Sequence, residues 1–258
     1  MRASFRSADG RSRIADLAER GGYRLALPDT FAAHLEATLV NTGGGIVGGD
    51  RVDIALDIGA GADIVFTTPS AERIYRCPGP PARVDVRLAL GADARLDWLP
   101  QQTILYAGAG LVRRIEADLH AGSRFLAAEI FAFGRPASRE PPASSTVNDR
   151  WRVCRNGRLL FAETLRLAGD FVEALDRPSV GGGARASGLI LYIASNAEDR
   201  LARVRAALAG APCECGASAW NEMLAVRLLA VRPADMVLTS ARAIEAVSGR
   251  PLPRAWLA

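Results

Sequence analysis

The chain has 258 residues, of which 49% are hydrophobic and 23% are charged, and its formal net charge is +4. Intrinsic disorder requires fewer apolar residues and a larger net charge, so the composition excludes a globally disordered chain and predicts a sizeable core. All 32 basic residues are arginines, and they are spread along the chain instead of forming a block. The basic balance therefore does not indicate a nucleic-acid-binding protein.

The N-terminus and the cysteines bear on where the protein works. Residues 1–6 are polar and lack the apolar run of a signal peptide. The longest apolar runs, such as residues 125–133, are too short to span a bilayer. Four cysteines in a chain of this length do not indicate a disulfide framework. We therefore expect a cytoplasmic protein that does not enter membranes.

Much of the chain alternates apolar and polar residues as half-buried strands do, most regularly in residues 52–58 and 83–88. The middle of the chain also repeats itself, because Gly59, Gly91 and Gly122 recur at intervals of 32 and 31 residues between strand-like segments. Each repeat ends in a proline turn, at Pro69, Pro100 and Pro136. Repeats of this length are typical of stacked units that bury their apolar faces against one another.

Two helices are predicted, both late in the chain. Residues 196–209 begin with a capping-box pattern at Ser195 and carry apolar residues on one face. Residues 234–248 begin after Pro233, and residues 221–231 between the two helices are apolar enough for a buried strand.

The predicted fold class is therefore all-β dominated: a stacked, β-helix-like (solenoid-like) body with two α-helices in the C-terminal third. A β-sandwich with regular hairpins gives a similar pattern and stays open as an alternative. We expect one domain over residues 1–258.

A glycine cluster at residues 43–49 precedes Asp50 and Arg51. Glycine-rich loops can hold a phosphate with backbone amides, but this cluster has no Gly-Lys-Ser/Thr sequence. It also leads into a predicted strand, whereas a dinucleotide site needs a helix after the glycines. The cluster is better interpreted as a close-packed turn that orients Asp50 and Arg51.

Two carboxylates stand in otherwise apolar strands. Glu129 is the only polar residue in residues 125–133, and Glu163 shares one strand face with Phe161. An unpaired buried carboxylate is costly, so each needs a partner, for which Arg135 is a candidate. Three interpretations stay open: a buried ion pair, a general acid with a raised pKa, and a polar passage for a cation.

Residues for a closed metal site or a catalytic triad are few. Cys213 and Cys215 have a one-residue spacer, which is unusual for a zinc site, and neither His34 nor His120 lies in a ligand-spaced cluster. The cysteine pair is interpreted as incidental, with a soft-metal contact as the alternative. The sequence contains no Gly-x-Ser-x-Gly elbow, so a hydrolase triad is not indicated.

Short motifs are distributed from about Arg13 to the C-terminus. They occupy residues 39–54, 67–71, 75–76, 96–104, 129–130, 133–138, 227–229 and 252–256. In this order and spacing they resemble the UreD (also called UreH) family of urease accessory proteins. Three positions depart from the family pattern: Gln102 stands where a glutamate is usual, Ala107 stands where an acidic residue is usual, and a lysine is usual near Arg73.

The resemblance implies a β-rich stacked fold and a scaffold that is not an enzyme. It implies UreF-like and UreG-like accessory proteins and apo-urease as partners, with neither nucleic acid nor a membrane. It also implies no stably bound cofactor, only nickel in transit through an internal polar tunnel. The tunnel positions carried over are the metal-contacting Asp50, Asp53, Glu129 and Glu163, with Arg51 and Arg135 as charge partners. Such a path should bind a cation weakly at several places, so that the cation can leave.

Two other function classes stay open. A stacked-β carbohydrate-active enzyme would use paired buried carboxylates about 5–10 Å apart in an open cleft. A nucleic-acid-binding module would gather arginines and aromatic residues on one face, and only 6% of this chain is aromatic. An enclosed channel with Glu129 and Glu163 on its wall would favour the scaffold over both.

Overall fold

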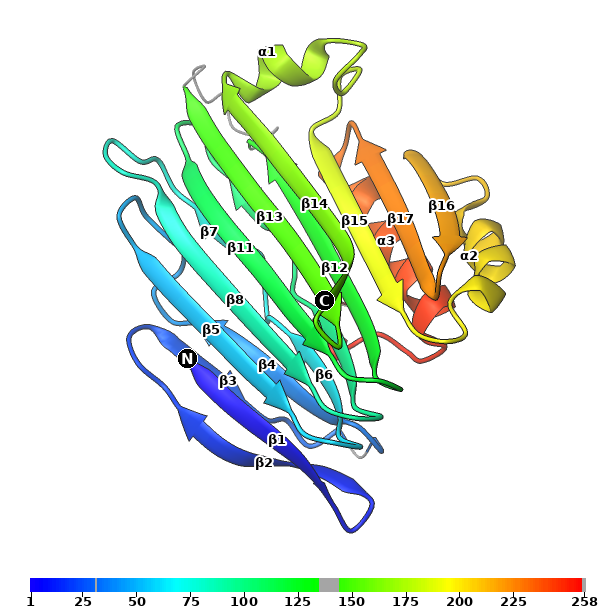
Figure 1. Cartoon of the computed structure of the whole chain (residues 1–258). Coiled ribbons are helices and arrows are strands. Elements are labelled where there is room, and N and C mark those ends of the chain that lie inside the picture. Colours follow the sequence, from blue (N-terminus) through cyan, green and yellow to red (C-terminus); the bar gives the residue numbers. More distant parts are fainter. Residues whose placement is uncertain (31, 135–143, 257–258) are drawn as a thin grey trace.

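The computed structural model describes residues 1–30, 32–134 and 144–256. Two large β-sheets pack face to face and enclose the main apolar core. Helices α2 (Leu201–Leu208) and α3 (Pro233–Ser248) cover the outer face of the second sheet and enclose a second apolar core (Figure 1). The chain therefore forms three layers: sheet, sheet and helices.

The first sheet has the strand order β14-β13-β11-β8-β5-β1-β2. Its strands are β1 (Arg2–Ala8), β2 (Arg11–Ala18), β5 (Arg51–Ile58), β8 (Ala82–Leu90), β11 (Gly110–Leu119), β13 (Ser145–Arg155) and β14 (Arg158–Gly169). The inner five strands are parallel to one another, and the edge strands β2 and β14 pair antiparallel with β1 and β13.

The second sheet has the order β16-β17-β15-β12-β9-β6-β4-β3, and the short strands β7 and β10 join it beside β12. Its strands are β3 (Tyr23–Ala26), β4 (Leu35–Asn41), β6 (Asp63–Thr67), β7 (Glu72–Ile74), β9 (Arg95–Leu99), β10 (Thr103–Leu105), β12 (Arg124–Phe133), β15 (Ala186–Ile193), β16 (Glu214–Trp220) and β17 (Met223–Ala230). Strands β4, β6, β9 and β12 are parallel, and β15, β17 and β16 extend them with antiparallel pairing.

The repeat predicted from the sequence is confirmed by this topology. Strands β5, β8 and β11 stack in the first sheet, and the strands that follow them, β6, β9 and β12, stack in the second. The chain thus forms a β-solenoid-like stack of about four turns. A sandwich of hairpins would instead pair strands that are neighbours in sequence, so that alternative is excluded for the repeated part.

The repeated glycines fit the stacking of the turns. Gly91 donates its backbone N–H to the carbonyl of Ile58 in the preceding turn, at 2.8 Å. A Cβ atom on Gly91 would lie 2.8 Å from the backbone nitrogen of Ala60, which is too close for any side chain. A glycine is therefore required where one turn lies directly on the next.

The two predicted helices are present with changed boundaries, and one helix was not predicted. Helix α3 begins one residue earlier than expected, and α2 is shorter because a 3₁₀ turn, Glu198–Arg200, precedes it. The expected capping box is wrong: Ala197 is the N-cap residue without a side-chain bond, and Glu198 accepts the N–H of Glu222 instead. The extra helix, α1 (Phe171–Asp176), is capped by Asp170. The strand predicted at 221–231 is confirmed as β17.

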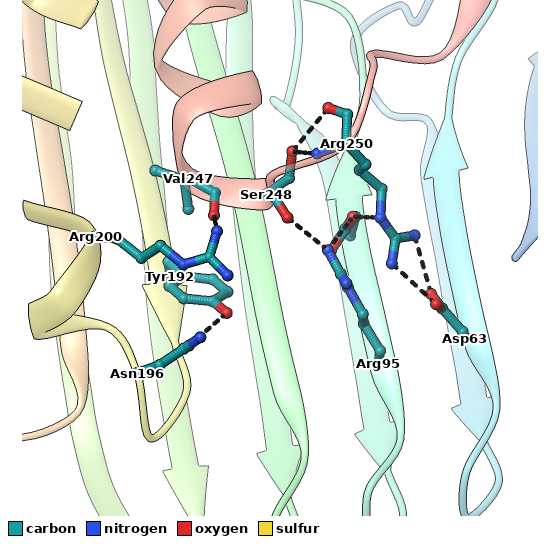
Figure 2. A network of polar contacts seen from close by, with 9 residues as sticks. Asp63, Arg95, Tyr192, Asn196, Arg200, Val247, Ser248 and Arg250 are labelled. Atoms are coloured by element: carbon teal, nitrogen blue, oxygen red, sulfur yellow. Dashed lines mark hydrogen bonds and ion pairs between the residues drawn. The ribbon is translucent and has the colours of Figure 1, made fainter. Parts of the chain in front are cut away.

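The end of α3 is tied to the second sheet by arginines (Figure 2). Arg200 donates to the carbonyl of Val247 at 3.1 Å, and Arg95 donates to the carbonyl of Ser248 at 3.2 Å. These carbonyls lack partners within the helix, so cationic donors stabilise its C-terminus. Beyond the helix, Arg250 forms a two-pronged ion pair with Asp63, with distances of 2.9 and 3.1 Å. The C-terminal segment is thereby fastened to β6 and β9.

The glycine cluster forms a close-packed turn, as predicted. Asp50 accepts the N–H of Val47 at 2.9 Å, and a Cβ atom on Gly48 would lie 2.1 Å from Cys77 Sγ and 3.0 Å from the carbonyl of Pro80.

We expect Gly48→Ala to lower the free energy of unfolding by about 1–3 kcal/mol, because the methyl group overpacks this contact. Chemical denaturation measures the loss. Gly79→Ala, where a Cβ meets nothing within 4 Å, is the matched control and should cost less. Equal losses would contradict the packing argument.

Candidate functional site

Glu129 lies in the middle of β12 and points into the core between the sheets. Phe125, Ala127 and Phe131 belong to that core, and Glu129 shares their side of the strand because side chains alternate. The residue is only 4% exposed. The prediction of a carboxylate buried within an apolar strand is confirmed.

Two charged residues of the first sheet meet Glu129. Arg113 on β11 and Asp149 on β13 lie side by side in the parallel register. Arg113 Nη2 lies 2.7 Å from Glu129 Oε2, and Arg113 Nε lies 2.7 Å from Asp149 Oδ1. These three residues, here called the charge cluster, join the two sheets through the core.

Neutral side chains complete the charge cluster. Thr103 Oγ1 donates to Glu129 Oε1 at 3.3 Å, and Trp151 Nε1 donates to Asp149 Oδ2 at 2.9 Å. The guanidinium carbon lies 4.8 Å from the ring centroid of Phe131, at the distance of a cation–π contact. Three of the four carboxylate oxygens therefore accept a hydrogen bond, and the fourth, Glu129 Oε2, has only its ion-pair contact with Arg113.

Burial sets the protonation of the charge cluster. Burial raises the pKa of Glu129 to about 7, although the positive charge of Arg113 acts in the opposite direction. The neighbouring Asp149 raises the pKa of Glu129 further. Burial alone would lower the pKa of Arg113, but the charges of Asp149 and Glu129 hold it above its ordinary value. The arginine therefore keeps its charge, while Glu129 titrates near neutral pH.

The charge cluster stands between two cavities. The first, here called the inner cavity, has a volume of about 70 Å³ and is lined by Thr103, Arg113 and Glu129 among apolar side chains. The second, here called the outer cavity, has a volume of about 260 Å³, lies among β12, β13, β14, β15 and β17, and is lined by Glu129, Asp149 and Glu163. Glu129 is thus on the wall of both cavities.

Glu163 lies on the outer cavity, on the edge strand β14. The prediction that Glu163 points inward is confirmed, because Phe161 and Leu165, two residues away on the same strand face, pack in or against the core. Its side chain is 30% exposed, and it pairs with Arg227 of β17, which is 57% exposed. The outer cavity therefore opens to solvent at this pair. The expected partner, Arg135, lies outside the described residues, and the structure gives Arg113 and Arg227 as partners of the two glutamates instead.

A further carboxylate on the inner cavity was not singled out in the sequence. Glu72 on β7 accepts hydrogen bonds from Tyr23 Oη and from Asn41 Nδ2, each at 2.9 Å. Burial raises the pKa of Glu72 and that of Tyr23. A small cavity of about 50 Å³ shares Tyr23 and Glu72 with the inner cavity and reaches the exposed Ser70. Polar groups therefore follow a series of cavities from Ser70 to Glu163.

The other predicted site residues lie on the surface. Asp50 closes its own turn by accepting the N–H of Val47, and Arg51 is exposed. The side chain of Asp53 is 70% exposed and lies 3.7 Å from Arg87. None of these predicted residues lines the inner or the outer cavity. The structure places Glu129 and Glu163 on the wall of the outer cavity, and a nickel contact at Asp50 or Asp53 stays a prediction.

The described residues contain no group of three or more histidine, cysteine, aspartate and glutamate side chains that could hold a metal ion. Cys213 Sγ donates to Thr239 Oγ1 at 3.3 Å. Burial raises the pKa of the neighbouring Cys215 thiol, which disfavours the thiolate that a metal would need. Within this part of the chain, the groups left to contact a metal ion inside the fold are the single carboxylates that line the cavities.

Sequence reasoning missed Arg113 and Asp149, although a signal for them exists. Arg113 stands between Leu111 and Ile115 on the inward face of β11, and Asp149 has the corresponding place on β13. The alternation of inward and outward side chains along a strand, which indicated Glu163, also indicates both of these residues. Glu72 carries no such signal, because its burial comes from strands and turns far away in the sequence.

The fold and the site define a stacked-β protein whose core holds a charge cluster between cavities with mostly apolar walls and a few carboxylates. In the described part of the chain, no helix is long and apolar enough to cross a membrane. A family model described as "UreD urease accessory protein" matches residues 1–257, and the chain belongs to this family.

Curated relatives agree with the family model. A urease accessory protein UreD of Methylobacterium sp. (strain 4-46) is 45% identical over 254 residues, which are 96% of this chain and 90% of the relative. The UreD of Azorhizobium caulinodans is 43% identical over 256 residues, 99% of this chain and 94% of the relative. A protein named UreD 3 from Methylorubrum extorquens (strain PA1) is 47% identical over 253 residues, 97% of this chain and 85% of the relative.

Proposed function

We propose that the protein is a urease maturation scaffold that acts with UreF-like and UreG-like accessory proteins, binds apo-urease and conducts nickel to the urease active site. Membership of the UreD family supports the role in urease maturation. The observation that carries the nickel path is that Glu129 lies on the wall of both the inner and the outer cavity. Nickel is the cargo in this proposal, and the protein catalyses no reaction of its own.

The chemistry of the cavities suits a hydrated cation in transit. Nickel(II) accepts carboxylate and water ligands. Glu72, Glu129 and Glu163 supply carboxylates at intervals, and a cavity needs only about 10–15 Å³ to hold one water molecule. A cation can leave each such place, because single carboxylates bind it weakly. The exposed Asp50 and Asp53 would contribute only where the cation approaches the surface.

A carbohydrate-active enzyme is the less favoured alternative. Its catalytic acid must reach a sugar in an open cleft. Both oxygens of Glu129 instead contact Thr103 and Arg113, and the residue is only 4% exposed. We therefore do not propose glycoside hydrolysis.

The variant Glu163→Gln tests the proposal. We expect urease matured with it to contain less nickel, whereas the melting temperature of the variant and its capture of a UreF-like partner stay near wild-type values. The stability cost should be below about 1 kcal/mol, because the pair with Arg227 is partly exposed. Melting temperature, partner pull-down and urease nickel content are measured on the same preparation.

Glu173→Gln is the matched control, because it breaks an exposed pair between Glu173 of α1 and Arg177 just after the helix, and neither residue lines the inner or the outer cavity. It should leave the nickel content unchanged. A strongly destabilised Glu163→Gln protein with normal nickel per folded complex would show that Glu163 is structural. Asp53→Asn in the same assay tests the predicted contact at the surface.

A further inference from the structure

Arg113 stands where a cation would cross between the inner and the outer cavity. Its guanidinium reaches from β11 of the first sheet to Glu129 of the second sheet, and its Nε atom bonds Asp149. The inner cavity is lined by Arg113 and the outer cavity by Asp149, with Glu129 on the wall of both. The guanidinium therefore lies against the one carboxylate, Glu129, that the linings of these two cavities share.

We propose that Arg113 is a tethered cation that occupies the carboxylate site between Glu129 and Asp149 and is displaced by a divalent cation in transit. The identity of that cation as nickel rests on the proposed function. The residue thus keeps the site filled when no cargo is present and lowers its affinity for cargo.

The charges of the cluster support displacement. When Glu129 and Asp149 are both ionised, two carboxylates face one guanidinium, and the cluster carries one excess negative charge. A divalent cation in place of the guanidinium would neutralise both carboxylates and would hold Glu129 in its ionised form. Without Arg113, the two buried carboxylates would lack a counter-ion and would bind a divalent cation tightly. With Arg113 in place, the cation must compete, because binding needs a state in which the guanidinium has moved away. A site weakened in this way can release its cargo.

The contacts of Arg113 with the two carboxylates differ in a way that permits the movement, and its Nη1 atom makes only a long hydrogen bond of 3.5 Å to Thr103 Oγ1. Nε makes an aligned hydrogen bond to Asp149, whereas the 2.7 Å contact of Nη2 with Glu129 Oε2 does not have hydrogen-bond geometry. The guanidinium can leave Glu129 and still lie over the ring of Phe131. Meanwhile Thr103 holds the other oxygen of Glu129 in place. Glu129 Oε2 is then free for the cation without rearrangement of the carboxylate.

The test measures binding of Ni²⁺ to the full chain by isothermal titration calorimetry. We expect Arg113→Gln to bind one Ni²⁺ with a Kd at least about tenfold lower than that of the wild type. The triple variant Arg113→Gln, Glu129→Gln, Asp149→Asn should lose this gain. Arg227→Gln is the matched control, because it removes an arginine that pairs with only one carboxylate on the outer cavity. It should show no gain.

Equal affinity of the wild type and Arg113→Gln, or a gain that persists in the triple variant, would overturn the proposal. Where Arg113→Gln fails to fold alone, Ni²⁺ should raise its melting temperature or its soluble fraction, because a ligand of the native state stabilises that state. A variant that stays unfolded at saturating Ni²⁺ would overturn the proposal as well. These binding results do not depend on urease. A gain in Ni²⁺ affinity in Arg113→Gln, together with normal urease nickel content in Glu163→Gln, would contradict the proposed nickel path but not the role of Arg113.

Discussion

Replacement of Arg250 by methionine is expected to lower the free energy of unfolding by about 3 kcal/mol at neutral pH, because it leaves a buried carboxylate with too little positive charge. Asp97 is only 1% exposed, and its Oδ2 atom lies 3.6 Å from Arg250 Nε. Arg95 stays at 3.4 Å from Asp97 and limits the loss. The same substitution breaks the pair with Asp63, which fastens the C-terminal segment to β6 (Figure 2).

Urea denaturation at several pH values checks this expectation. Burial already raises the pKa of Asp97, so in Arg250→Met its protonation on acidification should reduce the loss. The double variant Arg250→Met, Asp97→Asn should recover part of the stability, because it removes the unpaired charge. Arg200→Met is the control in the same region, since Arg200 donates to a backbone carbonyl, and it should cost less. An equal, pH-independent loss in both single variants would contradict the role of Asp97.

The solenoid-like body could be predicted because its signal is local and repeated. The alternation of apolar and polar residues is visible within each strand. The spacing of Gly59, Gly91 and Gly122 repeats because each turn of the chain stacks on the one before it, and the structure places these glycines in the stacked turns. Helix α1 could not be predicted in the same way, because six residues do not establish a helical period. The prediction of a capping box at Ser195 was wrong, because the Glu198 side chain instead accepts the N–H of Glu222 in the turn between β16 and β17.

The site was predictable where a single strand defines it. Glu129 and Glu163 followed from the faces of their own strands. Their partners did not, because Arg113 comes from the opposite sheet and Arg227 from β17, an antiparallel strand late in the chain. The alternation of side chains along a strand gives the face to which a side chain points. Only the topology of the sheets determines which charged residue it meets there.

Replacement of Glu129 by glutamine is expected to change how stability depends on pH. The pKa of Glu129 is about 7 in the folded chain, above the ordinary value of 4.5. Between these values the unfolded chain loses the proton while the folded chain keeps it, so this group makes wild-type stability fall as pH rises from about 4.5 to 7. Glutamine has no proton to lose, and the variant lacks this contribution.

The stability difference between Glu129→Gln and the wild type should therefore shift in favour of the variant by up to about 3 kcal/mol between pH 4.5 and 7.5, since one pKa unit corresponds to about 1.4 kcal/mol. Chemical denaturation at half-unit pH steps measures the difference, and comparison of the two proteins cancels the contributions of the other groups. Glu173→Gln, which changes an exposed carboxylate on α1, should show no such shift. A flat difference for Glu129→Gln would mean that the charge of Arg113 fully offsets the burial of the carboxylate, and that Glu129 is ionised throughout this range.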